Sequence, residues 1–502
     1  MTAPLTHLCS ARFYLDSITV SPMTVTPFRV PLMQDPKALY ECLASVQASA
    51  VNGSVIASVS LGLPSIDPLS ALEQLGYAER SHFYWEQPTE SIAIAAVQPI
   101  ASIALNGSDR FNRAQQFIAE VLQRTTTVGD LHLPLAGPHF FCSFTFFDRA
   151  HHEPQRFPGA RIFLPQWQIA CVQGKGVFVA NLSIDATSNL ELLTDSVWQT
   201  WRQLHRRSPS YRTGFSLPLL HIPPSCLNRQ ARFLKAAEST IAAIRQGELE
   251  KLVLSEVLEV TTATPLPLAP TLHKLRSRYR DCQIFSLKDD QGQGFIGASP
   301  ERLLQIQDRR LIADALAGSA PRGRTLLEDA ALGDRLLKSG KDIHEHQLVL
   351  SFIQQRLQGL GISPKAASPA HLLQLPNIQH LRTLVAADLP HGIHLFQVLA
   401  ALHPTPAVAG TPQHSAEPFL QRFEPFDRHL YAAPLGWVDY RGNGTFTVGI
   451  RSALLQENRL RLYAGAGIVA ESDPHKEWAE VRLKLQTLLQ ALVEYETRAV
   501  ND

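Results

Sequence analysis

"KLVLSEVLEVTT", residues 251–262, is the stretch that decides the fold class. Its β-branched and apolar residues are typical of a buried strand. The residues before it repeat at helical spacing, with Phe233, Ala237, Ile241 and Ile244 on one face. A helix that runs directly into a strand, with more helices and strands alternating behind it, predicts an α/β or α+β protein.

Segments on both sides extend this pattern. We expect strands in "FIGAS" (295–299), "GTFTVGIRSALL" (444–455) and "RLYAGAGIV" (461–469), and helices at about 328–360 and 474–496. Residues 1 to about 205 are typical of strands and loops, and "FLPQWQIACVQGKGVFVANLSI" (163–184) predicts a hairpin that turns at residues 173–176. The proline-rich segment 208–225 is a plausible connection between the two halves.

Composition excludes several classes of function. The 502 residues include 46 Lys and Arg against 45 Asp and Glu, a net charge of +1 without a long run of one sign, so we expect neither a nucleic-acid partner nor a membrane partner. The six cysteines form no CxxC motif and no close pairs, which argues against a disulfide scaffold or a zinc ribbon. With no signal peptide and no apolar span evident, we expect a soluble cytoplasmic protein.

"SGKDIHEHQLVL" (339–350) places a glutamate between two histidines. On a helix, His344 and His346 point about 160° apart, so they cannot grip one zinc ion. Glu345 lies in the middle of the apolar stripe, and a buried carboxylate must be protonated, paired with a cation or bound to a metal, for which oxygen ligands favour Mg²⁺ or Ca²⁺. The alternative is a rotated helix with a solvated Glu345.

"SDPHKEWAEVRLKLQTLLQAL" (472–492) carries strong helix-start signals, with Pro474 in the first turn. Glu477, Glu480 and Lys484 share one side of this helix, next to its apolar face. This charged stripe suits the wall of a cleft. The commoner alternative is a solvated pair of Glu480 with Lys484.

Two glycine-containing loops are candidates for anion binding. "YAGAGIVA" (463–470) contains a G-x-G-x-x-A pattern, but no helix opens directly behind it and no strand follows, so a dinucleotide-binding turn is disfavoured. We expect its glycines to let backbone amides approach an anionic ligand. "ALAGSAPRGR" (315–324) offers amides around Gly318 and Ser319 in the same way.

Taken in order, these motifs closely resemble those of the chorismate-utilising enzymes, the family of isochorismate, salicylate, anthranilate and aminodeoxychorismate synthases. The resemblance covers roughly residues 226–495. It rests on "EKLVLSE", "GFIGASPERLL", "ALAGSAPRG", "KDIHEHQLVL", "LHPTPAVAG", "LYAAPLGWVDYRGNG", "FTVGIRSALL" and "LYAGAGIVAESDPHKEWAEVRLK".

The resemblance implies a single large domain of two packed, mainly antiparallel sheets flanked by helices. Residues 1–225 would contribute strands to the common core, and residues 226–495 would form the chorismate-binding catalytic region. It also implies Mg²⁺ as the cofactor and chorismate as the small-molecule substrate.

Residue roles carry over from the family motifs as expectations. Glu345 and Glu480 match the magnesium ligands, with Glu477 a neighbour acting through water. Lys251 matches the general base that activates water, and Glu301 matches the general acid that protonates the departing 4-hydroxyl. His403 matches a site histidine of the family, although the prolines and small residues around it, taken alone, predict a structural histidine in a rigid loop. Matches to substrate-carboxylate contacts are Gly318, Ser319, Tyr431, Arg451, Gly465, Gly467 and Lys484.

The residues within these motifs favour one branch of the family. "DALAGSAPRG" together with a lysine at position 251 resembles the isochorismate and salicylate synthases, and "LHPTPAVAG" favours isochorismate synthase. Its product would feed menaquinone or phylloquinone synthesis, or siderophores. Salicylate synthase is the alternative; anthranilate or aminodeoxychorismate synthesis and an inactive chorismate-binding protein are disfavoured, and no amidotransferase subunit is expected. Glu256 and His429 stand where the family usually has Arg and Gly.

Overall fold

Strand β9 (Lys251–Thr262) forms where the sequence predicts it, in a computed structural model that describes residues 35–50, 53–76, 80–153, 156–206, 220–221 and 229–492. It pairs antiparallel with β21 (Arg459–Ile468), which places Val253 opposite Gly467. It also pairs with the short strands β17 (Gly410–Thr411) and β8 (Leu220–His221). The expected boundary at residue 225 lies outside the described residues.

The strands form one hydrogen-bonded network with two branches that part at β6 (Ala160–Val172). Strand β3 (Ile92–Leu105) follows the whole of β6, whereas β7 (Lys175–Ile184) and β5 (His139–Phe144) share its other edge. The first branch runs through β4 (Thr125–Gly129), β1 (Val55–Leu63), β7, β6, β3, β2 (His82–Gln87), β10 (Gln283–Lys288), β11 (Gln293–Ser299), β20 (Ser452–Gln456), β21 and β9. The second runs through β6, β5, β18 (Pro434–Asp439), β19 (Gly444–Val448), β12 (Arg302–Gln307), β13 (Arg310–Pro321) and β16 (Ile378–Asp388), with β14 (Lys365–Ala366) and β15 (His371–Gln374) on β16.

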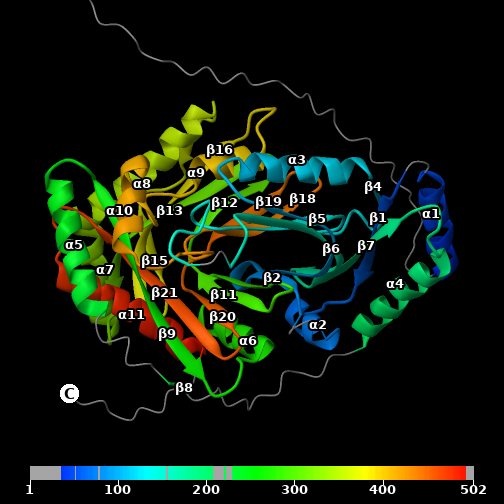
Figure 1. Ribbon diagram of the computed structural model, residues 1–502, viewed down its shortest axis with the longest axis horizontal. Coiled ribbons are helices and arrows are strands. Elements are labelled where there is room, and N and C mark those ends of the chain that lie inside the picture. The colour runs from blue at the N-terminus through cyan, green and yellow to red at the C-terminus, as the bar shows by residue number, and fades with distance from the viewer. Residues whose placement is uncertain are drawn as a thin grey trace, which may run out of the picture.

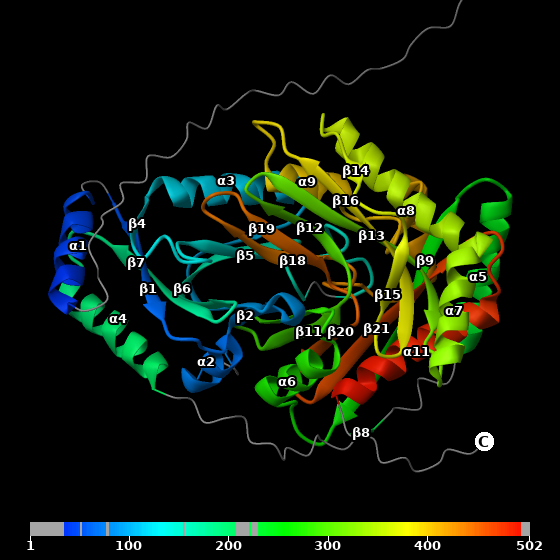
Figure 2. The same cartoon turned by 180° about the vertical axis from the view of Figure 1, so that it is seen from behind.

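The two branches pack face to face around the core (Figures 1 and 2). The Phe83 ring on β2 lies 5.1 Å from the Phe141 ring on β5, and Trp85 lies 6.2 Å from Trp437 on β18. Every described pairing is antiparallel except β1 with β4. The prediction of two packed, mainly antiparallel sheets is therefore confirmed, with β6 linking them into one network. Strands that precede residue 206 belong to both sheets, because β2 pairs with β10 in one sheet and β5 pairs with β18 in the other.

The prediction of one strand over residues 444–455 is wrong. The segment forms β19 and β20, which belong to different branches, and residues 449–451 cross from one sheet to the other. A straight strand cannot pair in both sheets, so the chain turns here, and Arg451 adopts a left-handed backbone with φ of 50°. This crossing brings the Arg451 side chain to the site described below.

The long helix expected at 328–360 is also two helices. These are α7 (Leu326–Lys338) and α8 (Gly340–Gly359), and Ser339 between them caps α8 by accepting a hydrogen bond from the Asp342 N–H. The helix expected at 474–496 is α11 (Pro474–Leu492), and its last four predicted residues lie outside the described part of the chain. Residues 163–184 form the predicted hairpin, from β6 into β7.

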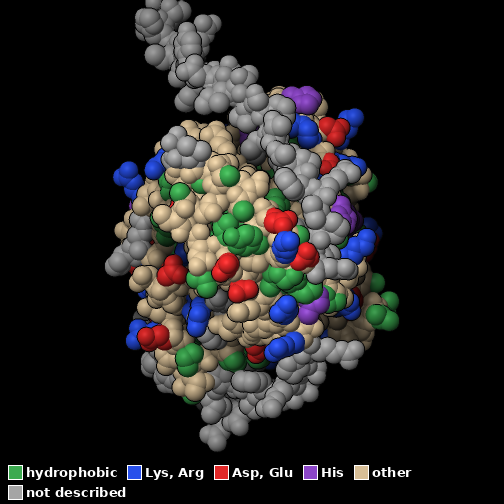
Figure 3. Space-filling model, turned by 90° about the vertical axis from the view of Figure 1, so that its right-hand side faces the viewer, with side chains coloured by type: hydrophobic (Ala, Val, Ile, Leu, Met, Phe, Trp, Pro, Cys, Tyr) green, Lys and Arg blue, Asp and Glu red, His purple; other side chains and the backbone are tan. Residues whose placement is uncertain are grey.

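The helices lie at the two ends and along both long sides of the sheets (Figure 1). Helix α8 packs on β13 and β16, and α11 packs on β21. On the face shown in Figure 3, acidic and basic side chains are interspersed. No helix in the described ranges is long and apolar enough to cross a membrane. The remaining helices are α1 (Pro36–Ala48), α2 (Pro68–Gln74), α3 (Arg110–Gln123), α4 (Leu190–His205), α5 (Arg229–Arg245), α6 (Leu268–Arg278), α9 (Leu395–Leu402), α10 (Gln413–Phe423) and the 3₁₀ helix η1 (Pro88–Glu90).

Candidate active site

Lys251 and Glu345 form an ion pair at the interior face of α8. Lys251 is the first residue of β9, and its side chain is completely buried. Its Nζ lies 2.8 Å from Glu345 Oε1, at an angle outside hydrogen-bond geometry. Glu345 is itself buried, so the alternative of a solvated glutamate on a rotated helix is wrong. Of the flanking histidines, His344 is exposed and His346 bonds through Nε2 to Thr383 Oγ1 at 2.8 Å.

Gly467 is required by this ion pair. A Cβ atom at position 467 would lie 2.3 Å from Glu345 Oε1 and 2.9 Å from Lys251 Cε. Gly465, two residues earlier, faces Tyr431, whose hydroxyl would lie 3.1 Å from an added Cβ. Both glycines therefore make room for side chains, an explanation that the glycine pattern alone did not provide.

Helix α11 supplies the next charged groups. Glu480 pairs with Lys484 at 2.6 Å, and Lys484 also donates a hydrogen bond to the Gly465 carbonyl at 2.8 Å. The pair is only partly exposed and is joined to β21, so it is more than the solvated surface pair considered from sequence. Glu477 is buried and bonds to Lys341 on α8, and burial raises the pKa of its carboxyl.

Glu477 on α11 pairs with Lys341 on α8, and the carboxylates of Glu345 and Glu480 act on the same lysine through their charge. Burial by itself would lower the pKa of Lys341, but Glu477, Glu345 and Glu480 together raise it above its ordinary value. Three carboxylates facing one small cation form a donor set that suits Mg²⁺ or Ca²⁺. Within the described ranges, no three acidic, histidine or cysteine side chains stand close enough to hold an ion in the present arrangement, since each acid here turns to a lysine.

Glu301, between β11 and β12, is buried, and one of its carboxyl oxygens has no partner among the described residues. Its side chain is 2% exposed, and its Oε1 has no hydrogen-bond partner among the described residues. Burial, followed by the negative charge of Asp314, raises the pKa of Glu301 to about 8, although Lys251 and Lys484 oppose the rise. The adjacent Arg302 pairs with Glu90 and not with Glu301.

A histidine that sequence reasoning missed links two of the expected substrate contacts. His380 on β16 receives the Arg451 guanidinium at Nε2, at 3.1 Å, and its Nδ1 lies 3.0 Å from Ser319 Oγ and 3.2 Å from the Gly318 carbonyl. Because a guanidinium only donates, Nε2 accepts and Nδ1 carries the hydrogen. Burial, then Arg451 and Lys484, lower the pKa of His380 to about 3, so it is neutral.

Two residues of the site, His380 and Lys341, were not predicted from the sequence. His380 becomes visible only through sheet register, which places it opposite Ser319. Lys341 stands four residues before Glu345, one turn earlier on the same helix face, and that spacing was available from sequence.

His403 and Tyr431 have different surroundings. The His403 ring packs against Phe111 and Phe146, and its Nε2 lies 3.3 Å from the Phe146 carbonyl. These contacts fit the structural alternative, and a role of His403 in substrate binding stays a prediction. Tyr431 is buried, stacks on Tyr463 with ring centroids 5.0 Å apart, and reaches the Gly465 backbone.

Both departures from the family pattern are accommodated. Glu256 is buried but pairs with Arg232 from α5. His429 adopts a φ of 49°, a conformation that glycine reaches without steric cost, and its Nε2 lies 3.8 Å from Glu153 Oε2. Each unusual residue therefore has a charged neighbour of its own.

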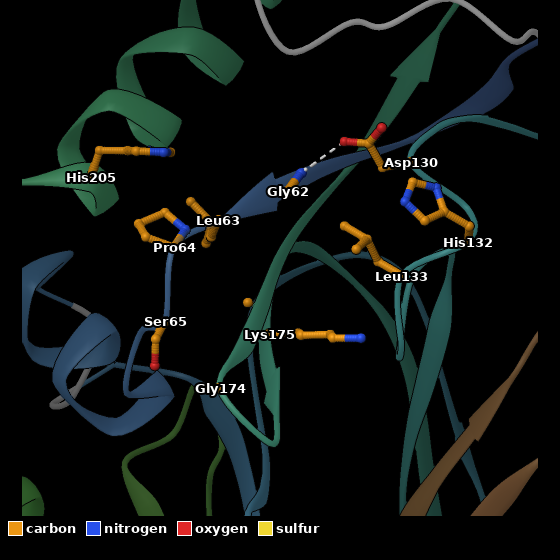
Figure 4. A pocket seen from close by; sticks show the side chains of 11 residues that line it. Gly62, Leu63, Pro64, Ser65, Asp130, His132, Leu133, Gly174, Lys175 and His205 are labelled. Atoms are coloured by element: carbon orange, nitrogen blue, oxygen red, sulfur yellow. Dashed lines mark hydrogen bonds between the residues drawn. The ribbon is translucent and has the colours of Figure 1, made fainter.

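An open hollow of about 410 Å³ lies in the other half of the molecule (Figure 4). Its lining comes from β1, β7, the end of α4 and nearby loops, and includes Asp130, His132, Lys175 and His205. None of the candidate site residues lines it, so the catalytic assignment does not involve this hollow.

Known proteins resemble this chain in sequence and in fold. The sequence profile described as "Chorismate binding enzyme" matches residues 39–493. The chain is 34% identical over 460 residues to the salicylate biosynthesis isochorismate synthase of Pseudomonas aeruginosa, covering 89% of this chain and 92% of that protein. It is 27% identical to the isochorismate synthase MenF of Bacillus subtilis, covering 89% and 95%. The solved structure of the menaquinone-specific isochorismate synthase MenF from Escherichia coli superposes with a TM-score of 0.71 at 26% identity, covering 91% of this chain and 99% of that one.

Proposed function

Because the chain belongs to the chorismate-binding enzymes, we propose that it is an isochorismate synthase. The reaction isomerises chorismate: water adds at C2, both ring double bonds shift, and the C4 hydroxyl takes a proton and leaves as water. One water molecule enters and one leaves, so the product is an isomer of the substrate. The names of the relatives support this product, and salicylate synthase is kept as the alternative.

The observation that carries the proposal is the state of Glu301. A general acid must hold its proton at working pH, and burial raises the pKa of this carboxyl to about 8. We assign to Glu301 the proton that the C4 oxygen takes as its bond to carbon breaks. We assign to Lys251, buried at the start of β9, the removal of a proton from the attacking water.

The other residues bind and orient the substrate. Arg451 and Lys484 are the cations for its carboxylates, and His380 holds Arg451 through a neutral ring nitrogen. Backbone at Gly318, Ser319, Gly465 and Gly467, with the Tyr431 hydroxyl, completes the proposed contacts. Water other than the reacting molecule is excluded because the strands around Lys251 are buried.

We propose Mg²⁺ as the cofactor, held by Glu345 and Glu480, with Glu477 reached through water. The fit rests on three carboxylates whose charges act on Lys341, one of which, Glu477, pairs with it. When bound, the ion would hold the ring carboxylate of chorismate. Glu345 then serves either the ion or Lys251, which is its partner in this structure.

The product would enter quinone synthesis (menaquinone or phylloquinone) or siderophore synthesis, and the proposed location is the cytoplasm. Cys42, Cys142, Cys171 and Cys282 are free thiols, which supports a reducing compartment. No amidotransferase subunit is part of the proposal, because water and not ammonia is the nucleophile.

The test is direct. Purified protein is incubated with chorismate and Mg²⁺, and the products are separated by chromatography; Lys251→Ala and Glu301→Gln are compared with Lys37→Ala and Glu41→Gln, matched changes on the exposed face of α1. Isochorismate from the wild type and both controls, but from neither site variant, supports the proposal. Salicylate with pyruvate moves the protein to the alternative, and no product from the wild type overturns both.

A further inference from the structure

We infer that Arg428 and Glu424 are positioning residues for Lys251, the proposed general base. Their buried ion pair takes the place of a neighbouring strand along the edge of β9, directly after Lys251. The inference rests on the proposed function in one respect, the role of Lys251 as the base. It gives a purpose to a buried ion pair that the proposed reaction does not otherwise use.

Lys251 depends on its strand for the position of its side chain. Its ammonium has an ion-pair partner in Glu345 but no hydrogen-bond partner among the described residues, so the backbone of β9 largely sets where it lies. One edge of this backbone pairs with β21 from Leu252 onwards. On the other edge, β17 pairs with Lys251 and Leu252, and no described strand pairs with residues 253–260. The backbone that follows the base therefore needs other partners on this edge.

Arg428 and Glu424 supply those partners. The Val253 N–H donates to the Ala409 carbonyl at 2.8 Å, but the Val253 carbonyl accepts from the Arg428 guanidinium at 2.7 Å. Two residues later, the Ser255 N–H donates to Glu424 Oε1 at 2.8 Å. A guanidinium and a carboxylate thus bond the C=O and N–H groups that a neighbouring strand would otherwise bond.

The same guanidinium joins β9 to two other segments. Arg428 is 1% exposed and donates to both oxygens of Glu424, at 2.7 Å and 2.6 Å. It also donates to the Val408 carbonyl at 2.6 Å, and it lies 4.4 Å from the centre of the Phe146 ring. Arg428 therefore serves four oxygen atoms, two from Glu424 and one each from Val253 and Val408. The five N–H donors of a planar guanidinium suit such a set, whereas an ammonium has three.

A purely structural role for the pair would be to hold these segments together. Such a role predicts lower stability when the pair is broken, but no displacement of Lys251 and no loss of kcat in the folded variant. A positioning role predicts both, because a catalytic group misplaced by about 1 Å lowers the rate by about 100-fold. We expect KM for chorismate to stay close to its wild-type value, since Lys251 is not among the proposed substrate-carboxylate contacts.

The experiment compares Arg428→Lys with the wild type by steady-state kinetics with chorismate and Mg²⁺, and by crystal structures of the metal-free protein. The lysine keeps the positive charge but cannot serve all four oxygens. We expect kcat to fall about 100-fold and the 2.8 Å distance between Lys251 Nζ and Glu345 Oε1 to change by about 1 Å. Arg276→Lys is the matched control, because Arg276 also bonds both oxygens of one acid, Asp67, and it is expected to leave both measurements unchanged.

The double variant Glu424→Leu/Arg428→Met covers the case in which Arg428→Lys does not fold. Removing both partners leaves no unpaired charge, and the same two changes are expected. If Lys251 keeps its position in a folded variant, the inference is overturned, whatever happens to kcat. If Lys251 moves but kcat does not fall, the inference on its position stands and the assignment of Lys251 as the base is wrong. If the wild type makes no product, the proposed function fails, and the crystal structures still decide the inference.

Discussion

The substitution Gly467→Ala tests the arrangement of the Lys251–Glu345 pair. A methyl group at position 467 would lie 2.3 Å from Glu345 Oε1. Carbon and oxygen atoms in contact stay about 3.3 Å apart or more, so the carboxylate must move by about 1 Å. It cannot then remain 2.8 Å from Lys251 Nζ, because the methyl also meets Lys251 Cε at 2.9 Å.

The expected cost falls on catalysis more than on stability. The displaced atom is the end of a flexible side chain, so we expect a loss of at most about 1–3 kcal/mol in the free energy of unfolding. A catalytic group misplaced by about 1 Å lowers the rate by about 100-fold, which corresponds to about 2.7 kcal/mol in the activation barrier. The fall is expected in kcat/KM.

The assay is chorismate turnover at saturating Mg²⁺, with thermal unfolding measured on the same preparations. Gly359→Ala is the matched control, because it lies at the end of α8 and an added Cβ there meets nothing within 4 Å. The control is expected to keep full activity. A folded Gly467→Ala protein with wild-type kcat/KM would refute this prediction, because the added methyl group leaves no room for the Glu345 carboxylate in its present position.

Three further changes follow from the charges and backbone of the site. The pKa of Glu301 is 4.5 in the unfolded chain and about 8 in the folded chain. At a pH between these values the folded chain keeps the proton and the unfolded chain releases it, so the contribution of Glu301 to the free energy of unfolding falls as the pH rises. Glu301→Gln is therefore expected to be more stable relative to wild type at pH 8 than at pH 5, in urea unfolding; an equal difference at both pH values contradicts this. Lys341→Gln removes the ammonium among three carboxylates, and calorimetry should show Mg²⁺ binding about tenfold more tightly, whereas unchanged or weaker binding argues against shared ligands. His429→Gly removes a side chain held at φ of 49° and is expected to change the free energy of unfolding by less than about 1 kcal/mol in denaturant titration; a larger loss means that the contact with Glu153 is important for stability.

Much of the fold was predictable because it depends on local periodicity. The strand at residues 251–262 and the helix from Pro474 carry strong patterns, and both form where expected. The errors occur where a local pattern continues across a change of direction. Residues 444–455 carry strand-forming residues on both sides of 449–451, but the two strands belong to different sheets, so the chain turns at 449–451. Ser339 likewise ends one helix and caps the next within a single apolar repeat.

The candidate site divides in the same way. Helical spacing was sufficient to place Glu345 on the interior face of its helix, and the order of the motifs was sufficient to indicate the family. Spacing did not show that Lys251, some ninety residues earlier, is the cation that pairs with Glu345. It also did not reveal His380, because that residue joins the site through strand pairing.

The sequence by itself therefore determined which elements form, which faces they bury and which chemistry the motifs resemble, since these depend on neighbours within one or two turns of the chain. Only the tertiary structure decided how the charges are paired: Lys251 with Glu345, Lys341 with Glu477, and Glu301 left without a cation of its own. Such pairings depend on the register between β9 and β21 and on the packing of α8 and α11 against the sheets. Contacts between residues far apart in sequence form only when the whole chain has folded, and no local pattern encodes them.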